Sequence, residues 1–239
     1  VGAASHSAED YHLKEVRLLL SYFTIDESKL RCAGHWPIYE PAKEAMLKQG
    51  ETCTDIHNNC SGKHAFMLAA AKHLGADENY LPIEHEVQKR ILERVQQRTH
   101  GAVVDTVVDG CGAPCFVLPL QGMATAWATL GVEMQNGASS LGKIGQAMMH
   151  EARYVSGTQR LDLAINQFKT EPLITKIGAE GLICGAYPSR GLGFAIKVRT
   201  GLGPLRPLAS LEVLNHWFPD NLPSQTVDLW TTILNVAGK

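Results

Sequence analysis

Apolar positions along the chain predict that its first two-thirds are mostly helical. Between residues 11 and 22 the apolar side chains fall on one helical face, and from Ile83 to Val95 they repeat every four residues after Pro82. A third apolar run, Ala65 to Leu74, is followed by Gly75, a residue typical of the position just past a helix end. Further helices are predicted over residues 41–48, 122–134, 140–155, 160–168 and 205–217.

The last third of the chain adds strands. Three apolar runs bounded by glycines, over residues 174–177, 182–187 and 192–198, are joined by short connections. Short connections indicate antiparallel pairing, because parallel strands need a long crossover. A β-branched run over residues 103–108 predicts one more strand. The pattern favours the α/β class, as an α/β sandwich whose mixed or antiparallel sheet is flanked by helices. Because no flexible linker interrupts it, we expect residues 1–239 to form a single domain.

Composition narrows the class of protein. The chain has 239 residues, of which 45% are hydrophobic, and this is enough for an ample core. A net charge of −2 argues against nucleic acid or an anionic membrane as partner, and no apolar run approaches the roughly 20 residues of a membrane span. Six cysteines are too few for a disulfide scaffold in a chain of this length. We therefore expect reduced thiols in a cytoplasmic protein.

The start of the sequence suggests a fragment. The chain opens on Val1 without an initiating Met, and residues 1–4 look like the interior end of a strand. We therefore expect the sequence to be truncated at its N-terminus.

Two cysteine motifs stand out, Asn58 to His64 and Asp109 to Pro114. Cys60 opens the predicted helix that ends before Gly75, and a thiol at a helix N-terminus is biased toward the thiolate. Residues three apart share a helical face, so Cys60 and Lys63 can converge on one point. These are the conditions for a metal ligand or a nucleophile. Buried structural cysteines, with Lys63 paired to a carboxylate, are the alternative that spacing alone favours.

Several motifs in a fixed order resemble one family, the type II bacterial L-asparaginases of the rhizobial kind. The family is distantly similar to serine β-lactamases, penicillin-binding proteins and glutaminases. The resemblance implies a β-lactamase/glutaminase-like fold and an amidohydrolase that converts L-asparagine to L-aspartate and ammonia. Besides the two cysteine motifs, it rests on Ala4–Asp10, Arg31–His35, Lys176–Gly181 and Gly191–Lys197.

The same resemblance implies that Ser5 and Lys176 are catalytic. A serine hydroxyl is a weak nucleophile until a base takes its proton, and a lysine can be that base if its pKa is lowered. Taken alone, Ser5 is typical of a strand end or a helix cap, and Lys176 of a solvated surface. Ile177 stands where the lactamase pattern has a hydroxyl residue. The family's Ser-x-x-Lys element is expected upstream of Val1, and we attribute the match at residues 140–143 to chance. The fragment alone is therefore expected to be nearly inactive.

The resemblance also implies zinc, bound by Cys60, Lys63 and Cys111. Two thiolates suit zinc, and three protein ligands leave one tetrahedral position for water. Lysine can take part only as the neutral amine. His64 and Asp109 are expected to face the substrate or to support the ligands. The motif Arg31–His35 has no role that we can derive from the sequence.

Two other functions compete with a serine/lysine amidohydrolase. One is a truncated, non-catalytic metal-binding remnant of the same fold. The other is a cysteine hydrolase that uses Cys60 and His64. In the leading interpretation the partner is the small molecule L-asparagine, with neither nucleic acid nor membrane, and a homodimer is a candidate assembly.

Overall fold

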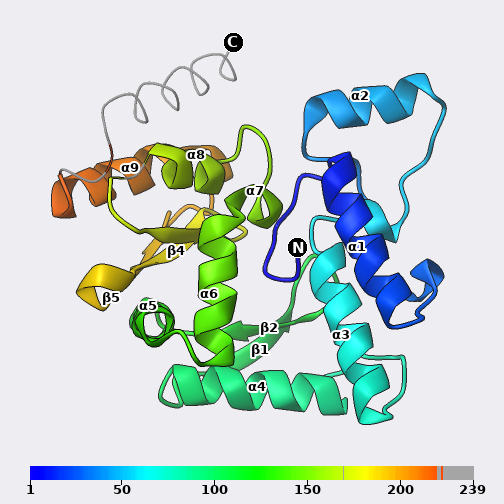
Figure 1. The fold of residues 1–239 in the computed structure, drawn as a ribbon, viewed down its shortest axis with the longest axis horizontal. Helices are drawn as coiled ribbons and strands as arrows, with labels where there is room; N and C mark the ends of the chain where they lie inside the picture. Colours follow the sequence, from blue (N-terminus) through cyan, green and yellow to red (C-terminus); the bar gives the residue numbers. More distant parts are fainter. Residues whose placement is uncertain (169, 220–221, 223–239) are drawn as a thin grey trace. The chain divides into compact units, whose positions relative to one another are not determined.

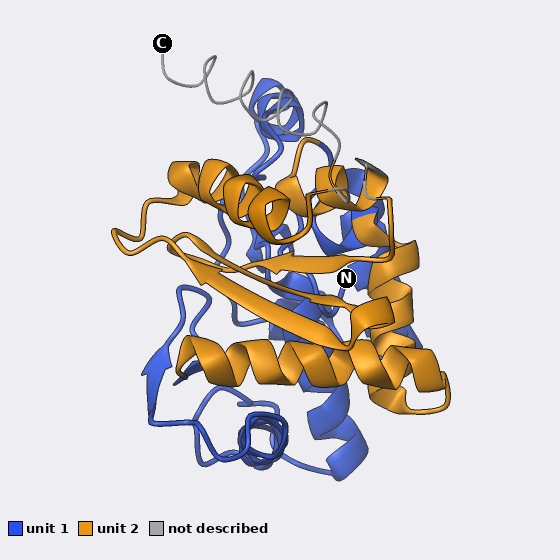
Figure 2. Cartoon of the chain, turned by 90° about the vertical axis from the view of Figure 1, so that its left-hand side faces the viewer, with its two compact units in different colours: residues 1–118, 153–158 blue, residues 119–152, 159–239 orange. Residues whose placement is uncertain are grey.

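The structure, a computed structural model, describes residues 1–168, 170–219 and 222. The chain forms two compact units (Figure 2). Unit 1 comprises residues 1–118 and 153–158, and unit 2 comprises residues 119–152 and 159–239. Elements are labelled in Figure 1. That residues 1–239 act as a single domain stays a prediction.

Unit 1 is built mainly from helices. Helices α1 and α3 lie side by side (Figure 1) and share a buried apolar core that includes Val16, Leu20 and Leu68. The helices predicted over 11–22, 41–48 and 65–74 are confirmed. The elements are α1 (Asp10–Tyr22), η1 (Glu27–Lys29), α2 (Glu40–Lys48), η2 (Asp55–His57), α3 (Ser61–Leu74), α4 (Glu86–Arg98), β1 (Asp105–Val108) and β2 (Pro114–Val117).

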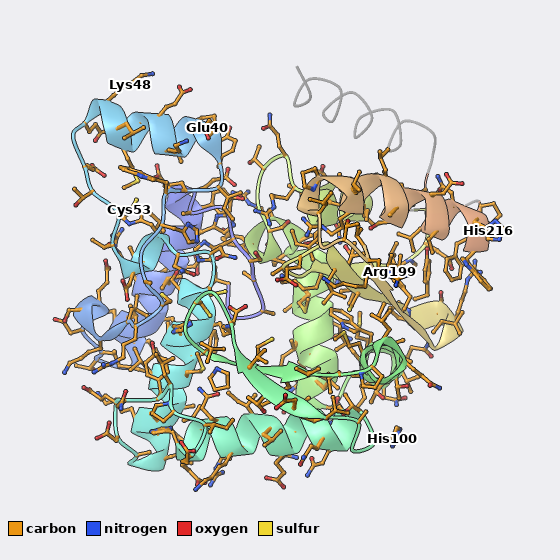
Figure 3. The ribbon with its side chains drawn as sticks, turned by 180° about the vertical axis from the view of Figure 1, so that it is seen from behind. Glu40, Lys48, Cys53, His100, Arg199 and His216 are labelled. Atoms are coloured by element: carbon orange, nitrogen blue, oxygen red, sulfur yellow. The ribbon has the colours of Figure 1, made fainter. Side chains whose placement is uncertain are left out.

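Local signals fix where these helices begin and end. Cys60 is the N-cap of α3, and Gly75 ends it with a φ of 64°, in the left-handed region that favours glycine. In α2, Glu40 and Lys48 lie at opposite ends (Figure 3), where their charges complement the helix dipole. Helix α4 begins at Glu86 rather than near Ile83, because the side chain of His85 accepts a hydrogen bond from the backbone N–H of Val87 and caps the helix there.

The first residues form a turn, so the expectation that residues 1–4 are a strand end is wrong. The backbone N–H of Ala4 donates to the carbonyl of Val1 at 3.0 Å. The turn lies against the start of α3, where a Cβ at Gly62 would meet the Val1 carbonyl oxygen at 2.5 Å. The chain then runs extended through Ser5, whose backbone N–H donates to the carbonyl of Val155 at 2.9 Å. The N-terminal loop is therefore held between the start of α3 and the segment that contains Val155.

Unit 2 contains a three-stranded antiparallel sheet, as the short connections predicted. Its order is β3–β4–β5, with β3 (Ile174–Ile177), β4 (Leu182–Tyr187) and β5 (Leu192–Lys197). The remaining elements of this part of the chain are α5 (Leu120–Asn136), α6 (Ser140–His150), α8 (Leu161–Phe168), η3 (Pro188–Arg190), η4 (Gly203–Leu205) and α9 (Arg206–Trp217). The strands and helices predicted for this region are confirmed except for one long helix.

The helix predicted over residues 140–155 is wrong in length. It breaks at Glu151 into α6 and a short helix, α7 (Ala152–Val155). The chain leaves unit 2 at this point and joins unit 1. There the carbonyls of Arg153 and Val155 accept hydrogen bonds from His12 and Ser5. These long-range bonds favour the break, and they are invisible in the local sequence pattern.

Helices cover both faces of the sheet in unit 2. The side chains of Ile177, Ile183 and Phe194 pack with α8 and α9 on one face. On the other face α5 approaches so closely that a Cβ at Gly193 would meet its backbone at 2.0 Å. Lys176 pairs with Cys184 in register, and the strand alternation therefore places it on the α5 face. The layers confirm the α/β class. Among the described helices, none has both the length and the apolarity that crossing a membrane requires.

Candidate functional site

Four of the predicted site residues come together in unit 1. The side-chain ligand atoms of Cys60, Asp109 and Cys111 all lie within 4.8 Å of one another. The Nζ atom of Lys63 lies 3.2 Å from the Sγ atom of Cys111 and 4.0 Å from Oδ2 of Asp109. We call Cys60, Lys63, Asp109 and Cys111 the thiol cluster. Helical spacing predicted that Cys60 and Lys63 converge. In the structure, Asp109 and Cys111 join them from a loop that is distant in sequence.

Two backbone features place the thiols. Cys60 stands at the N-terminus of α3, where its backbone N–H donates to Oδ1 of Asn58 at 2.7 Å. Cys111 stands in the loop between β1 and β2, where its backbone N–H donates to Oδ2 of Asp109 at 3.2 Å. Gly112 follows with a φ of 82°, a value that L side chains rarely adopt. The loop therefore turns at the glycine and directs Asp109 and Cys111 to the same point.

The cluster holds mixed charge. A hydrogen bond with Cys60, together with burial, raises the pKa of Cys111 to about 12, so this thiol keeps its proton at neutral pH. Burial opposes the charge on Lys63, but Cys60, Cys111 and Asp109 outweigh it and raise the lysine pKa. Burial likewise opposes the charge on Asp109, but hydrogen bonds from Cys111 and the nearby Lys63 lower its pKa. A bound cation would have to displace the protons of both the thiol and the ammonium.

His64, the residue after Lys63, is fully buried. Its Nδ1 atom is 2.9 Å from the hydroxyl of Tyr80, and its Nε2 atom has no hydrogen-bond partner among the described residues. The imidazole acts on Cys111, where it lowers the thiol pKa against the stronger effects that raise it. Its predicted contact with substrate stays a prediction.

Ser5 lies beside the start of α3. Its hydroxyl oxygen accepts a hydrogen bond from Nδ2 of Asn59 at 2.7 Å, and Asn59 immediately precedes Cys60. The serine is half-buried. Lys176 is a half-buried residue of β3 in unit 2, where its Nζ donates to the carbonyl of Ile177 at 2.5 Å. Because Ser5 and Lys176 belong to different units, their convergence stays a prediction.

A comparison with protein families decides the family. The family model described as L-asparaginase II matches residues 1–234. The chain belongs to the L-asparaginase II family. It is an L-asparaginase-type amidohydrolase, the family implies L-asparagine as its substrate, and the resemblance drawn from the motifs is confirmed. No curated protein matches the chain.

In this member of the L-asparaginase II family, sequence reasoning missed the residues that hold the site together. Nδ2 of Asn58, which is buried, donates to the carbonyls of Cys32 and Ala33 at 2.6 and 2.7 Å. Nε2 of His35 lies 3.0 Å from Oδ1 of Asn59. The one signal in the sequence was the pair of asparagines before a helix start, because Asn commonly caps helices. Nothing in the sequence pairs them with residues 32–35.

Proposed function

We propose that this L-asparaginase II family member hydrolyses L-asparagine through Ser5 and Lys176, beside one zinc ion held by Cys60, Lys63 and Cys111. The observation that supports this proposal is the convergence at the start of α3. Two thiols and an amine meet there, and the Ser5 hydroxyl is bonded to the residue next to Cys60. A catalytic hydroxyl and a metal site would thus lie together at the start of α3.

The donor set of the thiol cluster fits zinc. Two sulfur ligands and one nitrogen ligand suit this ion, and three ligands leave a fourth tetrahedral position open. Asp109 would support the ligands through the hydrogen bond that it accepts from the backbone of Cys111. His64 adds a buried imidazole beside Cys111. When bound, zinc would polarise or position the substrate amide.

The chain's own residues would move protons during acyl transfer. A serine oxygen attacks the side-chain amide carbon of asparagine, and Ser5 and Lys176 take up the proton that it loses. Lys176 then gives that proton to the departing nitrogen, which leaves as ammonia. Water hydrolyses the resulting serine ester, releasing aspartate and restoring the hydroxyl. Backbone N–H groups stabilise the negative oxygen that forms in each step.

Ammonia release from L-asparagine by the natural protein tests the catalytic assignment. Ser5→Ala and Lys176→Met should each lower kcat by about 10²- to 10⁴-fold, the usual worth of general acid–base groups. Ser140→Ala is the matched control, because Ser140 is exposed on α6 and reproduces only the Ser-x-x-Lys spacing. A loss of less than about threefold for Ser5→Ala would reject a catalytic Ser5. Glutamine turnover equal to that of asparagine would reject the substrate.

Elemental analysis and an X-ray absorption spectrum at the zinc edge test the metal. One zinc per chain is expected, and Cys60→Ser or Cys111→Ser should reduce it because each removes a thiolate. Cys53→Ser is the control, since Cys53 is a half-buried thiol in the loop after α2 (Figure 3). Substoichiometric zinc in the natural protein, or a spectrum fitted by four sulfur ligands, would refute the assignment.

A further inference from the structure

Strand β3, which carries Lys176, lies at one edge of the sheet in unit 2. The sheet has the order β3–β4–β5, so β3 pairs with β4 alone. The backbone N–H of Gly178 donates to the carbonyl of Leu182 at 2.8 Å. In an antiparallel pair the neighbouring residue directs its N–H the other way, so the N–H of Ile177 points away from β4. This donor needs a partner from outside the sheet.

Two charged side chains bind the backbone at this edge. Oδ2 of Asp162, in the first turn of α8, accepts a hydrogen bond from the Ile177 N–H at 3.2 Å. Nη1 of Arg206, the first residue of α9, donates to the carbonyl of Gly178 at 2.8 Å. The two side chains therefore fix the peptide groups on either side of the one that joins Ile177 to Gly178.

The peptide group between them holds Lys176. Its carbonyl, that of Ile177, accepts a hydrogen bond from Nζ of Lys176. A neutral lysine amine keeps two of its N–H donors, so it can make this bond without its charge, and its lone pair then points away from Ile177. A base whose lone pair has a fixed direction is what the proposed proton transfer requires.

The charges around this edge favour a role in positioning over one in stability. Asp162 is 2% exposed, and an isolated carboxylate at that depth would be costly. Burial lowers the pKa of Arg160 and of Arg206, and the nearby Asp162 carboxylate opposes this effect on each. Apolar side chains of similar volume often stabilise a buried position as well as a set of charges does, or better. Directional bonds to the backbone are what the charged set adds.

We propose that Asp162 and Arg206 are positioning residues that hold Lys176 for proton transfer, acting through the backbone of Ile177 and Gly178. The proposal rests on the proposed function, in which Lys176 takes up the proton and returns it, and it gives neither residue a contact with substrate. Because only the backbone of Ile177 takes part, an apolar side chain is compatible with this position, where the lactamase pattern has a hydroxyl residue.

Two readouts in the natural protein test the proposal: kcat and KM for asparagine, and the rate at which acetic anhydride labels Lys176, followed by peptide mass spectrometry. Asp162→Ala removes the acceptor for Ile177, and Arg206→Met removes the donor to Gly178. Each should lower kcat by about 10- to 100-fold, because a small displacement of a reacting group costs this much. KM should stay within about twofold, because Lys176 acts on the proton rather than on substrate binding. Labelling of Lys176 should rise by about 3- to 10-fold as its bond to Ile177 loosens.

Conservative variants separate positioning from folding. Asp162→Asn keeps an oxygen that can accept from Ile177, and Arg206→Lys keeps a donor toward Gly178, so each should recover part of kcat. Arg206 is half-buried and Met approaches its length, so Arg206→Met keeps the proposal testable even where Asp162→Ala does not fold. If Asp162→Ala and Arg206→Met both keep kcat within about threefold and Lys176 labelling within about twofold of the natural protein, the proposal is wrong.

The controls are two exposed residues and a second lysine of the same sheet. Asp10→Ala changes an acidic residue in the first turn of α1, and Arg199→Met changes an arginine past the end of β5 (Figure 3). Lys197 of β5 is the internal reference. A rise in its labelling equal to that of Lys176 would show general loosening of the sheet and overturn the proposal. Retained asparaginase activity in Lys176→Met would refute the proposed function, and the labelling of Lys176 would still decide whether Asp162 and Arg206 hold it.

Discussion

Unit 1 and unit 2 bury different kinds of side chain beneath the residues they contribute to the proposed site. Unit 1 buries polar groups, among them His6, His12, Asn58 and His64, next to its apolar core. Most of these polar groups are fixed by hydrogen bonds to residues far away in sequence. Unit 2 buries fewer polar side chains, which among the described residues are Asp162, Thr175 and Ser210. The cluster around its sheet is aliphatic and aromatic, and Lys176 is placed by strand register.

The difference shows how each unit fixes the positions of its side chains. A hydrogen bond is directional, so unit 1 can fix the orientation of a hydroxyl or a thiol, but the loss of one partner leaves the other buried and unsatisfied. Apolar packing depends on volume and tolerates swaps of similar size. We therefore expect unit 1 to be sensitive to changes of polarity and unit 2 to be sensitive mainly to changes of volume.

The largest effect is expected for Asn58→Leu, a swap of similar size in unit 1. It would leave the carbonyls of Cys32 and Ala33 and the backbone N–H of Cys60 without their partner. With roughly 1–3 kcal/mol for each buried group left unsatisfied, we expect the free energy of unfolding to fall by about 3–5 kcal/mol. Urea denaturation measures it, with the exposed Asn79→Leu as control. A loss below about 1 kcal/mol would show that unit 1 is not held by these bonds.

A smaller effect is expected from pH on His12. Burial lowers the pKa of this imidazole to about 4, below the value of about 6.5 expected in the unfolded chain. Its Nδ1 accepts from the backbone N–H of Glu9, so protonation there breaks a helix cap. Between these pH values the unfolded state binds more protons, so stability is full above pH 6.5 and falls as pH drops toward 4.

The contribution of His12 is on the order of 3 kcal/mol across this window. Comparing urea unfolding of the natural protein and of His12→Gln at several pH values isolates it, and His73→Gln is the exposed control. Equal slopes for the natural protein and His12→Gln would contradict a neutral, buried His12.

The smallest effect is expected for Ile183→Leu in unit 2. Ile183 is fully buried on the sheet face that packs against α8 and α9, and the swap conserves volume. Such swaps usually cost less than about 1.5 kcal/mol, whereas Ile183→Ala should cost about 2–5 kcal/mol. The same urea titration measures both. If Ile183→Leu were as harmful as Asn58→Leu, the contrast between the two units would be lost.

The sequence predicted much of the fold because local periodicity and helix-end residues are local properties. The run that ends at Gly75 and the three glycine-bounded strands illustrate this. The failures came from distant contacts. Residues 1–4 turn against α3, and the predicted helix breaks at Glu151, where the chain joins the N-terminal loop. Strand β2 was missed because it is four residues long and begins with Pro114.

The candidate site divides in the same way. Helical spacing predicted that Cys60 and Lys63 converge, and in the structure both lie beside Cys111. Cys111 lies 48 residues after Lys63, so its place could come only from family resemblance. The contact of His35 with Asn59 spans 24 residues and depends on a loop attached by Asn58. No periodic pattern encodes such a pairing.

The hydrogen bonds between Glu9 and Thr158 have a consequence for folding during synthesis. Both carboxylate oxygens of Glu9 accept hydrogen bonds from Thr158, which follows 149 residues later. The backbone N–H of Ser5 likewise donates to the carbonyl of Val155, far along the chain. During synthesis, residues 5–9 leave the ribosome well before residues 155–158, which supply their hydrogen-bond partners. Contacts of such long range slow folding, so the newborn chain keeps the loop that bears Ser5 unassembled until residues 155–158 have left the ribosome.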